Sequence, residues 1–384
     1  MKRLRSNLTA RALSGLLRVV PPGDHVFVHG MPPTEGNAVE VAKALVKLTD
    51  ACIVWPDAPP DYYLESLGIP VARVRRLASA RSWASLWSFV RARAVFHTHG
   101  LYGCPTPSRR HPIVNVWHGD SFKLGRHFPD RKLKGPCATY GIASSVVMGR
   151  IKADLSEMPY EQLLIVGNPR TSQMFSPPAR RQLEALGIDS ARPFVMWMPT
   201  FRVAQDSTGR VAWLNTKDPC SDRALANVIA TVAERLSEAG FSLVVKPHML
   251  DATARAVPNA LILTNEDLMQ KRVPLYSLLG ASAGLISDYS SVWIDYLAID
   301  RPIGFLVDDL EDFRASRGLA EPQLIRDYPG EHLDSTKGIE AFIADLHSEG
   351  ELTRARRTDF KEKIGYVVSR NSGEKIVRAT LKLA

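Results

Sequence analysis

The 384-residue sequence has few cysteines and no long apolar run. Its four cysteines lie far apart and none forms a C-x-x-C pair. This argues against a disulfide framework and a cysteine zinc site, and it favours a reducing, cytoplasmic compartment. No apolar stretch approaches the roughly 20 residues that a membrane-spanning helix needs. Arg11 and Arg18 interrupt the basic N-terminus, which predicts a short amphipathic helix there and not a signal peptide.

The sequence also lacks the short motifs of several large enzyme classes. It contains no G-x-x-x-x-G-K-[ST] loop and no G-x-G-x-x-G turn, the glycine-rich segments that bind nucleotide phosphates. The hydrolase motifs H-E-x-x-H and G-x-S-x-G are absent as well. No D-x-D triplet is present to hold a divalent ion on a nucleotide diphosphate. A bound diphosphate is therefore expected to be neutralised by cationic side chains, hydroxyl groups and a helix end, without a metal.

Positive charge is concentrated in the first part of the chain. Residues 1–160 contain 22 Lys and Arg against 11 Asp and Glu, a net charge of +11, and the remainder has 27 against 29, a net charge of −2. This asymmetry indicates an anionic partner: nucleic acid, a phosphate-rich substrate or a membrane surface. Residues 73–93 place tryptophans at helical spacing among arginines, which suits an anionic bilayer. A surface helix that packs its tryptophans on the core explains the pattern equally well.

Short β-branched runs alternate with segments of helix length. The expected strands are 25–29, 51–55, 94–98, 113–117, 163–166, 194–198, 242–246, 260–264 and 283–287. Apolar strands separated by helices predict parallel sheets that are covered on both faces. At this length, two doubly wound α/β domains are favoured over one large sheet. The boundary is expected near 168–180, where glycine, asparagine and three prolines cluster.

Polar residues follow several of these strands. Ligands of α/β domains bind at the carboxyl ends of the strands, so such residues are candidates for a cleft between two domains. The candidates are His118, Gly119, Asp120, Thr200, Arg202, Lys246, His248, Asp288, Ser290 and Ser291. His118 has the pKa range of a general base, and Gly119 lets a ligand approach the backbone. A hydrogen-bonded structural histidine is the alternative interpretation of His118. The nearby His97, His99 and His111 lack a carboxylate at helical spacing, so no metal site is predicted.

The segment SDYSSVWIDYLAIDRPIGF predicts a strand that runs directly into a helix. Free N–H groups and the positive end of the helix dipole favour an anion at such a junction. Ser290 and Ser291 can donate to the same anion, although ordinary N-capping also accounts for these residue types. Cations near the other strand ends favour a shared diphosphate site: Arg202, Lys246, His248 and Arg301.

Several blocks occur in the order seen in one family: NVWHGDSFKLG, GNPRTS, PTFR, KPH, SDYSSVWIDYLAIDRPIGF, DDLEDFRASRGL and SGEKIVRA. Over residues 113–378 the chain resembles the CDP-glycerol glycerophosphotransferases, the teichoic acid primases and polymerases with related capsule polymer enzymes. The resemblance implies a GT-B fold, two Rossmann-like domains that face each other across a central cleft. Residues 1–170 would form an acceptor and membrane-side domain and 171–365 a CDP-polyol-binding domain. A final helix, 366–384, would cross back to the first domain.

The resemblance also implies the chemistry. A glycerol phosphate unit would pass from CDP-glycerol to a hydroxyl of a lipid-linked saccharide acceptor, with release of CMP and no cofactor. His118 would accept the hydroxyl proton, and His248 would bind the diphosphate and stabilise developing charge. Further substrate-binding residues would be Gly119, Asn168, Arg170, Thr200, Arg202, Lys246, Asp288, Ser290, Ser291 and Arg317. Because family acceptors are lipid-linked, the enzyme would work in the cytoplasm, peripherally on the inner face of the cell membrane.

The sequence departs from the family pattern in places, and other functions remain open. Asp120 and Ser121 replace the usual Thr and Pro, and Met249 stands where the histidine block usually ends in proline. One alternative is a GT-B glycosyltransferase that uses a nucleotide sugar, and another is a CDP-ribitol-dependent ribitolphosphotransferase. A non-catalytic protein that binds an anionic polymer or membrane is a third. Nucleic acid is not an expected partner, because the basic residues accompany tryptophan and leucine and form no recognisable nucleic-acid module.

Overall fold

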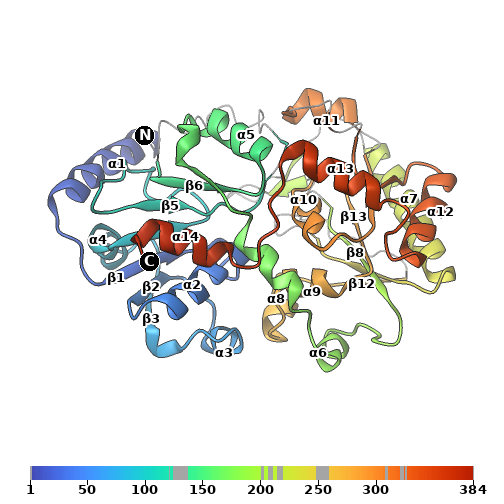
Figure 1. The fold of residues 1–384 in the computed structure, drawn as a ribbon, viewed down its shortest axis with the longest axis horizontal. Helices are drawn as coiled ribbons and strands as arrows, with labels where there is room; N and C mark the ends of the chain where they lie inside the picture. The colour runs from blue at the N-terminus through green and yellow to red at the C-terminus, as the bar shows by residue number, and fades with distance from the viewer. Residues whose placement is uncertain are drawn as a thin grey trace. The chain divides into compact units, whose positions relative to one another are not determined.

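The computed structural model describes residues 2–120, 122–123, 137–199, 203–205, 211–213, 219–247, 259–307, 310–320, 324 and 327–383. The chain forms two compact units, shown as ribbons in Figure 1. Unit 1 comprises Met1–Asp120, Lys132–Ser172 and Gly365–Ala384, and unit 2 comprises Ser121–Arg131 and Gln173–Ile364. Within the described ranges, no helix has both the length and the apolarity that a membrane crossing requires.

Unit 1 contains a seven-stranded parallel sheet in the order β3-β2-β1-β4-β5-β6-β7. The strands are β1 (His25–His29), β2 (Cys52–Pro56), β3 (Val74–Leu77), β4 (Ala94–His97), β5 (Ile113–Asn115), β6 (Tyr140–Ala143) and β7 (Leu163–Ile165). The helices are α1 (Lys2–Val19), α2 (Gly36–Leu48), α3 (Asp61–Ser66), α4 (Trp83–Arg91), α5 (Val146–Ser156) and α14 (Ser372–Leu381). Three 3₁₀ turns accompany them: η1 (Val71–Arg73), η2 (Tyr160–Gln162) and η3 (Pro169–Phe175), the last of which spans the unit boundary.

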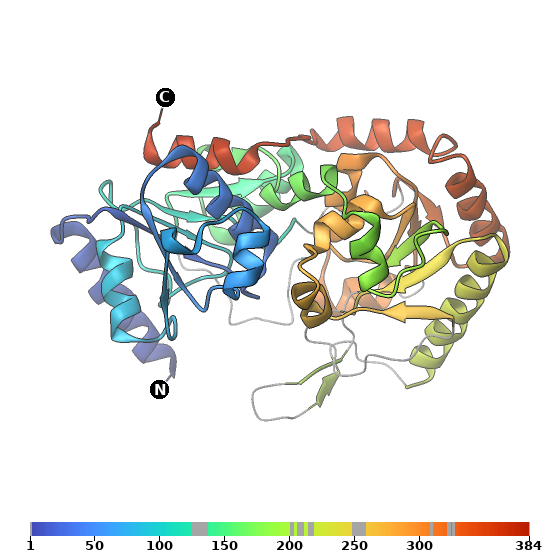
Figure 2. The ribbon, with the colours of Figure 1, turned by 90° about the horizontal axis from the view of Figure 1, so that it is seen from below.

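The central strands of unit 1 are apolar at successive positions because both faces of the sheet are covered. Val26 and Val28 pack on one side with α2 and α14, and the intervening Phe27 packs on the other with α1 and α4. The C-terminal helix α14 lies against α2, as Figure 2 also shows. Gly373 permits this close approach, since a Cβ there would lie 2.8 Å from the Glu40 carbonyl oxygen.

Unit 2 contains a six-stranded parallel sheet in the order β12-β11-β8-β13-β14-β15 and a separate antiparallel pair, β9 and β10. The strands are β8 (Phe194–Trp197), β9 (Val203–Gln205), β10 (Val211–Trp213), β11 (Ser242–Val245), β12 (Ala260–Ile262), β13 (Gly284–Ser287), β14 (Ile303–Phe305) and β15 (Glu331–His332). The helices are α6 (Arg180–Ala185), α7 (Pro219–Glu238), α8 (Asn265–Gln270), α9 (Leu275–Ala281), α10 (Val292–Tyr296), α11 (Leu310–Arg317), α12 (Thr336–His347) and α13 (Arg354–Ile364), with a 3₁₀ turn η4 (Leu297–Ile299).

All the strands expected from the sequence are present, with ends that shift by up to two residues. Segment 73–93 is not one helix: it begins in η1, continues as β3 and becomes helical only at α4. The two sheets of parallel strands with interspersed helices confirm the predicted α/β class.

Candidate functional site

His118 lies in a sharp turn that follows β5. Because β4 and β5 are parallel neighbours, with His97 paired to Asn115, the loops after both strands leave the sheet at the same edge. Trp117 has a φ of 52° and Gly119 a φ of 122°, both in the left-handed region. Glycine adopts this region freely, whereas an aromatic residue does so only when its surroundings impose it. The turn is therefore a conformation that the rest of unit 1 must hold.

The imidazole of His118 lies nearly parallel to two other rings. Its centroid lies 4.1 Å from that of His99, with 7° between the planes, and 5.6 Å from that of Trp117, with 11° between the planes. Nδ1 of His118 lies 3.4 Å from the Thr98 carbonyl oxygen. With Nδ1 on that side, Nε2 is the nitrogen placed to accept a proton from another group.

Several features lower the pKa of His118. Neighbouring protein atoms partly desolvate the ring, although the side chain stays accessible to solvent, and the nearby His99 ring adds to this effect. The cations of Arg170 and Lys152 act in the same direction, and only the Thr98 carbonyl opposes it. All these effects except the last favour the neutral imidazole, which is the form that a general base requires.

The backbone around His118 is hydrogen-bonded to two buried side chains. The side-chain amide of Asn37, at the start of α2, donates to the carbonyls of Val116 and Trp117 at 2.9 and 3.2 Å. The Arg170 guanidinium donates to the His118 carbonyl at 2.9 Å. Asn37 also accepts from the Arg170 backbone N–H at 2.9 Å. Three consecutive carbonyls at the turn are thus bound by donors from distant parts of the chain.

Arg170 is itself paired inside the protein. Its guanidinium lies 3.3 Å from Glu35, whose carboxylate also accepts from the Ala38 N–H and caps α2. Burial raises the pKa of Glu35 to about 7, against the opposing charge of Arg170. Arg170 was expected to bind substrate, and the structure places it against Glu35 and the His118 carbonyl. Asn168 is fully buried, and its backbone carbonyl accepts from both the hydroxyl and the backbone N–H of Thr171 at the start of η3.

Asp120, one of the residues that depart from the family pattern, has a partner that the sequence did not indicate. Its side chain is fully buried, forms an ion pair with Lys152 of α5 and accepts from the Ser144 N–H at 2.6 Å. Lys152 also donates to the Ile142 carbonyl at 2.7 Å, and its Nζ lies 5.5 Å from the centroid of the Trp117 ring. The pair therefore ties the end of the His118 turn to α5.

In unit 2 the residues Asp288 to Ser291 follow β13 as expected. Asp288 is buried and its carboxylate accepts from the Ser290 N–H at 2.9 Å, which fixes the turn. Ser290 and Ser291 are partly exposed, so their hydroxyls can reach a ligand. The helix that follows, α10, is short: it spans five residues before it tightens into η4.

Lys246 and Arg301 occupy different surroundings. Lys246 follows β11, its Nζ donates to the Pro247 carbonyl at 2.8 Å, and burial lowers its pKa to about 8. Arg301 instead donates to the carbonyls of Gly280 and Ser282 at the carboxyl end of α9. It therefore stabilises that helix end, whereas the sequence suggested a diphosphate contact for Arg301. Other predicted residues lie outside the described part of the chain: Thr200, Arg202, His248 and the side chain of Arg317.

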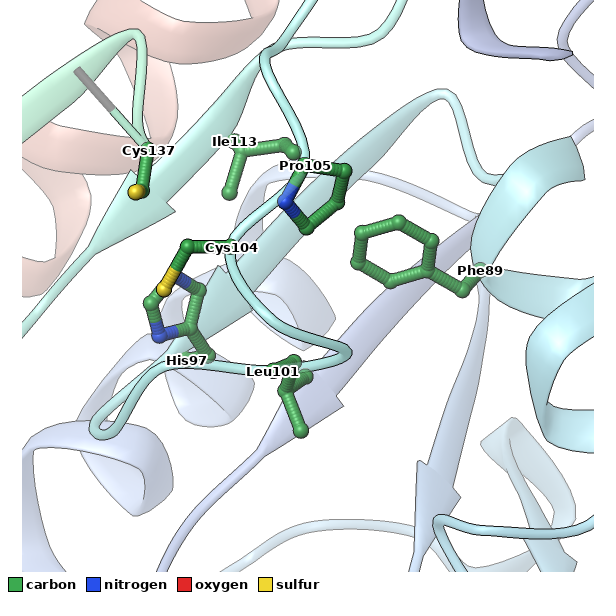
Figure 3. Close-up of a pocket in the computed structure, with 7 residues that line it drawn as sticks. All are labelled: Phe89, His97, Leu101, Cys104, Pro105, Ile113 and Cys137. Carbon is green, nitrogen blue, oxygen red and sulfur yellow. The ribbon is translucent and has the colours of Figure 1, made fainter. Parts of the chain in front are cut away.

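A small cavity lies beside His97 in unit 1 (Figure 3). Its volume of about 10 Å³ is room for roughly one water molecule, which is far too little for a nucleotide. Burial lowers the pKa of His97 to about 4. The ring of His111 bridges the carbonyls of Ala92 and Val20 at 2.9 and 2.8 Å. Among the described residues, no three His, Cys, Asp or Glu side chains are grouped so that they could hold a metal ion.

Two units with parallel sheets, and polar residues after the carboxyl ends of their strands, are typical of the GT-B class. The structure superposes on the wall teichoic acid polymerase TagF with a TM-score of 0.71, at 15% identity over 99% of this chain and 97% of that one. It also matches a UDP-GlcNAc 2-epimerase from Neisseria meningitidis with a TM-score of 0.52, at 13% identity over 94% of this chain and 99% of that one. At these identities the likeness shows the fold, and it confirms the predicted GT-B class.

Sequence comparison supplies the family. The model described as CDP-Glycerol:Poly(glycerophosphate) glycerophosphotransferase matches residues 70–382, and the chain belongs to this family. A curated relative, the teichoic acid ribitol-phosphate primase of Bacillus spizizenii, is 38% identical over 102 aligned residues. That match covers 22% of this chain and 26% of the relative, so only about a quarter of the relative's length is spanned.

Proposed function

We propose that this protein transfers a glycerol phosphate unit from CDP-glycerol to a hydroxyl of a lipid-linked saccharide acceptor, and releases CMP, in the synthesis of teichoic acid or a related cell-surface polymer. The observation that carries the proposal is the family match over residues 70–382. The accessible His118 imidazole at a strand end of unit 1 supports it. A histidine-to-asparagine variant of TagF was solved after a soak with CDPG, which is consistent with such a donor.

The proposed mechanism assigns the acceptor to unit 1 and the donor to unit 2. The acceptor oxygen attacks the phosphorus that bears glycerol, and its proton passes to Nε2 of His118. The new O–P bond forms as the bond to the CMP oxygen breaks, so CMP leaves with the bridging oxygen. Ser290, Ser291 and Lys246 bind the donor phosphates, and His248 and Arg202 complete this role. The anionic oxygens repel the nucleophile, so positioning and charge stabilisation supply most of the rate.

The second candidate donor is CDP-ribitol, because the curated relative is named a ribitol-phosphate primase. The two donors differ in the length and hydroxyl count of the polyol. The protein groups that hydrogen-bond the polyol hydroxyls would therefore distinguish the two donors. A site that hydrogen-bonds a hydroxyl rejects an analogue that lacks it far more strongly than an apolar pocket rejects an extra group.

Donor competition tests the proposal. The purified protein is incubated with a lipid-linked disaccharide analogue and CDP-glycerol, CDP-ribitol or UDP-GlcNAc, and release of CMP or UDP is measured together with the product mass. We expect acceptor-dependent CMP release from CDP-glycerol at a rate roughly tenfold or more above that from CDP-ribitol. A product that gains ribitol phosphate would show that CDP-ribitol, and not CDP-glycerol, is the donor. Release of UDP with a sugar-bearing product would overturn the proposal.

The proposal includes docking on the inner face of the cell membrane through α4 and the adjacent α1. In α4, Phe89 and Val90 pack on the core, whereas the side chains of Trp83 and Trp87 are 86% and 57% exposed. The interpretation that both tryptophans pack on the core is therefore wrong. The adjacent α1 carries the exposed apolar residues Leu8, Leu16 and Val19 and the exposed Arg11 and Arg18. Arg75 of β3, which donates to Ser88 of α4, and Arg81 before α4 add exposed positive charge, whereas Arg76 is paired with Asp61. Tryptophan and arginine together suit an anionic lipid surface.

Liposome flotation tests this docking face. We expect the Trp83→Ser/Trp87→Ser double variant to bind anionic vesicles about tenfold more weakly than the parent protein, because it loses two interfacial aromatic anchors. Val368→Ser, which removes an exposed apolar side chain elsewhere in unit 1, serves as the matched control and should bind like the parent. Equal recovery of the parent protein with neutral and anionic vesicles would count against the docking face.

A further inference from the structure

We propose that Asn37 is the positioning residue that fixes the turn carrying His118. This inference rests on the proposed function, because it deepens the role given to His118. Asn37 is fully buried, and it uses its amide in three hydrogen bonds: two donated to consecutive carbonyls, Val116 and Trp117, and one accepted from the backbone of Arg170. A side-chain amide can donate two hydrogen bonds and accept two, so this site uses most of its capacity.

We call these three hydrogen bonds of Asn37 the clamp. The turn needs the clamp because hydrogen bonds within the turn do not by themselves hold its backbone. Trp117 is held at a positive φ, which aromatic residues adopt rarely, and the flanking Gly119 is also left-handed. The Trp117 N–H is taken up by the side chain of Asn115, at 2.9 Å, so β5 supplies one hydrogen bond to the turn. The carbonyls of Val116 and Trp117 both accept from the Asn37 amide, so loss of this amide removes the two hydrogen bonds that hold them in this arrangement.

The clamp joins three segments that are far apart in the sequence. Asn37 is 79 residues from Val116 and 133 residues from Arg170. Arg170 in turn donates to the His118 carbonyl. The Asn37 amide therefore holds the turn directly, through two carbonyls, and also holds the backbone of Arg170, which binds the third carbonyl. Loss of the amide therefore frees the segment immediately before His118 and weakens the placement of the guanidinium behind it. A displacement of about 1 Å at a catalytic group lowers turnover by roughly 10²-fold.

The test compares Asn37→Ala with a control on the same helix. We expect Asn37→Ala to lower kcat for acceptor-dependent CMP release by roughly 10- to 100-fold, with the Kd for CDP-glycerol changed by less than about twofold. Thr49→Val removes two hydrogen bonds at the opposite end of α2 and should keep the parental kcat. If Asn37→Ala does not fold, Asn37→Ser, which leaves a smaller cavity and keeps one polar group, takes its place. A kcat within about twofold of the parent overturns the proposal.

A double-variant cycle separates positioning from other roles. If Asn37 acts through His118, Asn37→Ala in a His118→Asn background should reduce the residual rate by less than about twofold, because the group it positions is already gone. Full additivity of the two losses would show that Asn37 acts elsewhere and would overturn the proposal.

A histidine NMR titration makes the test independent of turnover. The His118 signal is identified by its loss in His118→Asn. In Asn37→Ala its midpoint should move up toward the ordinary histidine value, because the ring no longer stays beside His99 and Arg170. An unchanged midpoint in folded Asn37→Ala overturns the clamp even if no donor supports catalysis. A shifted midpoint without turnover on any donor would instead reject the proposed function and retain the clamp.

Discussion

Replacement of His118 with asparagine is expected to lower kcat by roughly 10²- to 10⁴-fold, the range that general base catalysis contributes. Asparagine keeps a polar atom near the position of Nδ1, close to the Thr98 carbonyl, but has no atom in place of Nε2. The turn should therefore persist while the proton acceptor is lost. Initial rates of CMP release, with titration calorimetry for CDP-glycerol, check this result. The affinity for CDP-glycerol should change little, since the proposed donor site lies in unit 2.

Two variants sharpen this prediction. The paired change Ser290→Ala/Ser291→Ala should show the opposite pattern, with weaker CDP-glycerol binding, because it removes two hydroxyl donors from the proposed phosphate site. His347→Asn changes an exposed histidine at the end of α12 and should leave kcat and the affinity for CDP-glycerol unchanged. Turnover of His118→Asn at the parental rate would refute the role of His118 as the base.

The role of His118 as the base also predicts how kcat/KM depends on pH. A general base must be neutral, and the pKa of His118 lies below its ordinary value of 6.5 because of partial desolvation and the nearby His99, Arg170 and Lys152. The acid limb of kcat/KM is therefore expected below pH 6.5, with activity retained as the pH falls through that value. The unfolded chain takes up this proton more readily than the folded protein does, so His118 also lowers stability as the pH falls below about 6.5.

Replacement of Lys152 with methionine is expected to destabilise unit 1 by about 3–5 kcal/mol, the usual cost when one partner of a buried ion pair is removed. Asp120 is fully buried, and the side chain of Lys152 is only 11% exposed, so water cannot replace the lost cation. Methionine preserves most of the volume of the lysine stem. Urea unfolding followed by tryptophan fluorescence measures the change, and Trp117 reports locally because its ring lies beside Lys152.

The double variant Asp120→Thr/Lys152→Met distinguishes a charge effect from a packing effect. It restores the residue type usual in the family at position 120 and leaves no unpaired buried charge. It should therefore be much closer to the parent protein in its free energy of unfolding than Lys152→Met alone. If Lys152→Met unfolds within about 0.5 kcal/mol of the parent, the pair does not support the His118 turn in the way its geometry indicates.

Besides the antiparallel pair β9 and β10, four strands of the two parallel sheets were not predicted from the sequence, and they share weak local patterns. β3 is an edge strand that carries two exposed arginines, Arg75 and Arg76, so its apolar content is low. β6 contains Gly141, which is poor in strand propensity but is favoured there because a Cβ would meet the Leu163 side chain. β14 and β15 have three and two residues. β5, β7 and β12 are also only three residues long, but their predicted apolar runs extend beyond the paired residues. The missed segments gave no such signal, and parallel pairing with neighbours is what makes them strands.

The candidate site divides in a similar way. His118, Gly119, Asp288, Ser290 and Ser291 were expected because each follows an apolar strand, and the structure places all of them after β5 or β13. His99 drew attention only as a possible metal ligand, and its ring stacks on His118.

The sequence by itself determined the α/β class, the main strands and the family blocks, because these depend on apolar periodicity and on motifs within short segments. Only the tertiary structure decided what surrounds His118. Glu35 and Asn37 look like an ordinary helix start, and Lys152 looks like a surface lysine of α5. Their hydrogen bonds and ion pairs join side chains that folding brings together from distant segments, and no pattern within one segment encodes a contact of that kind.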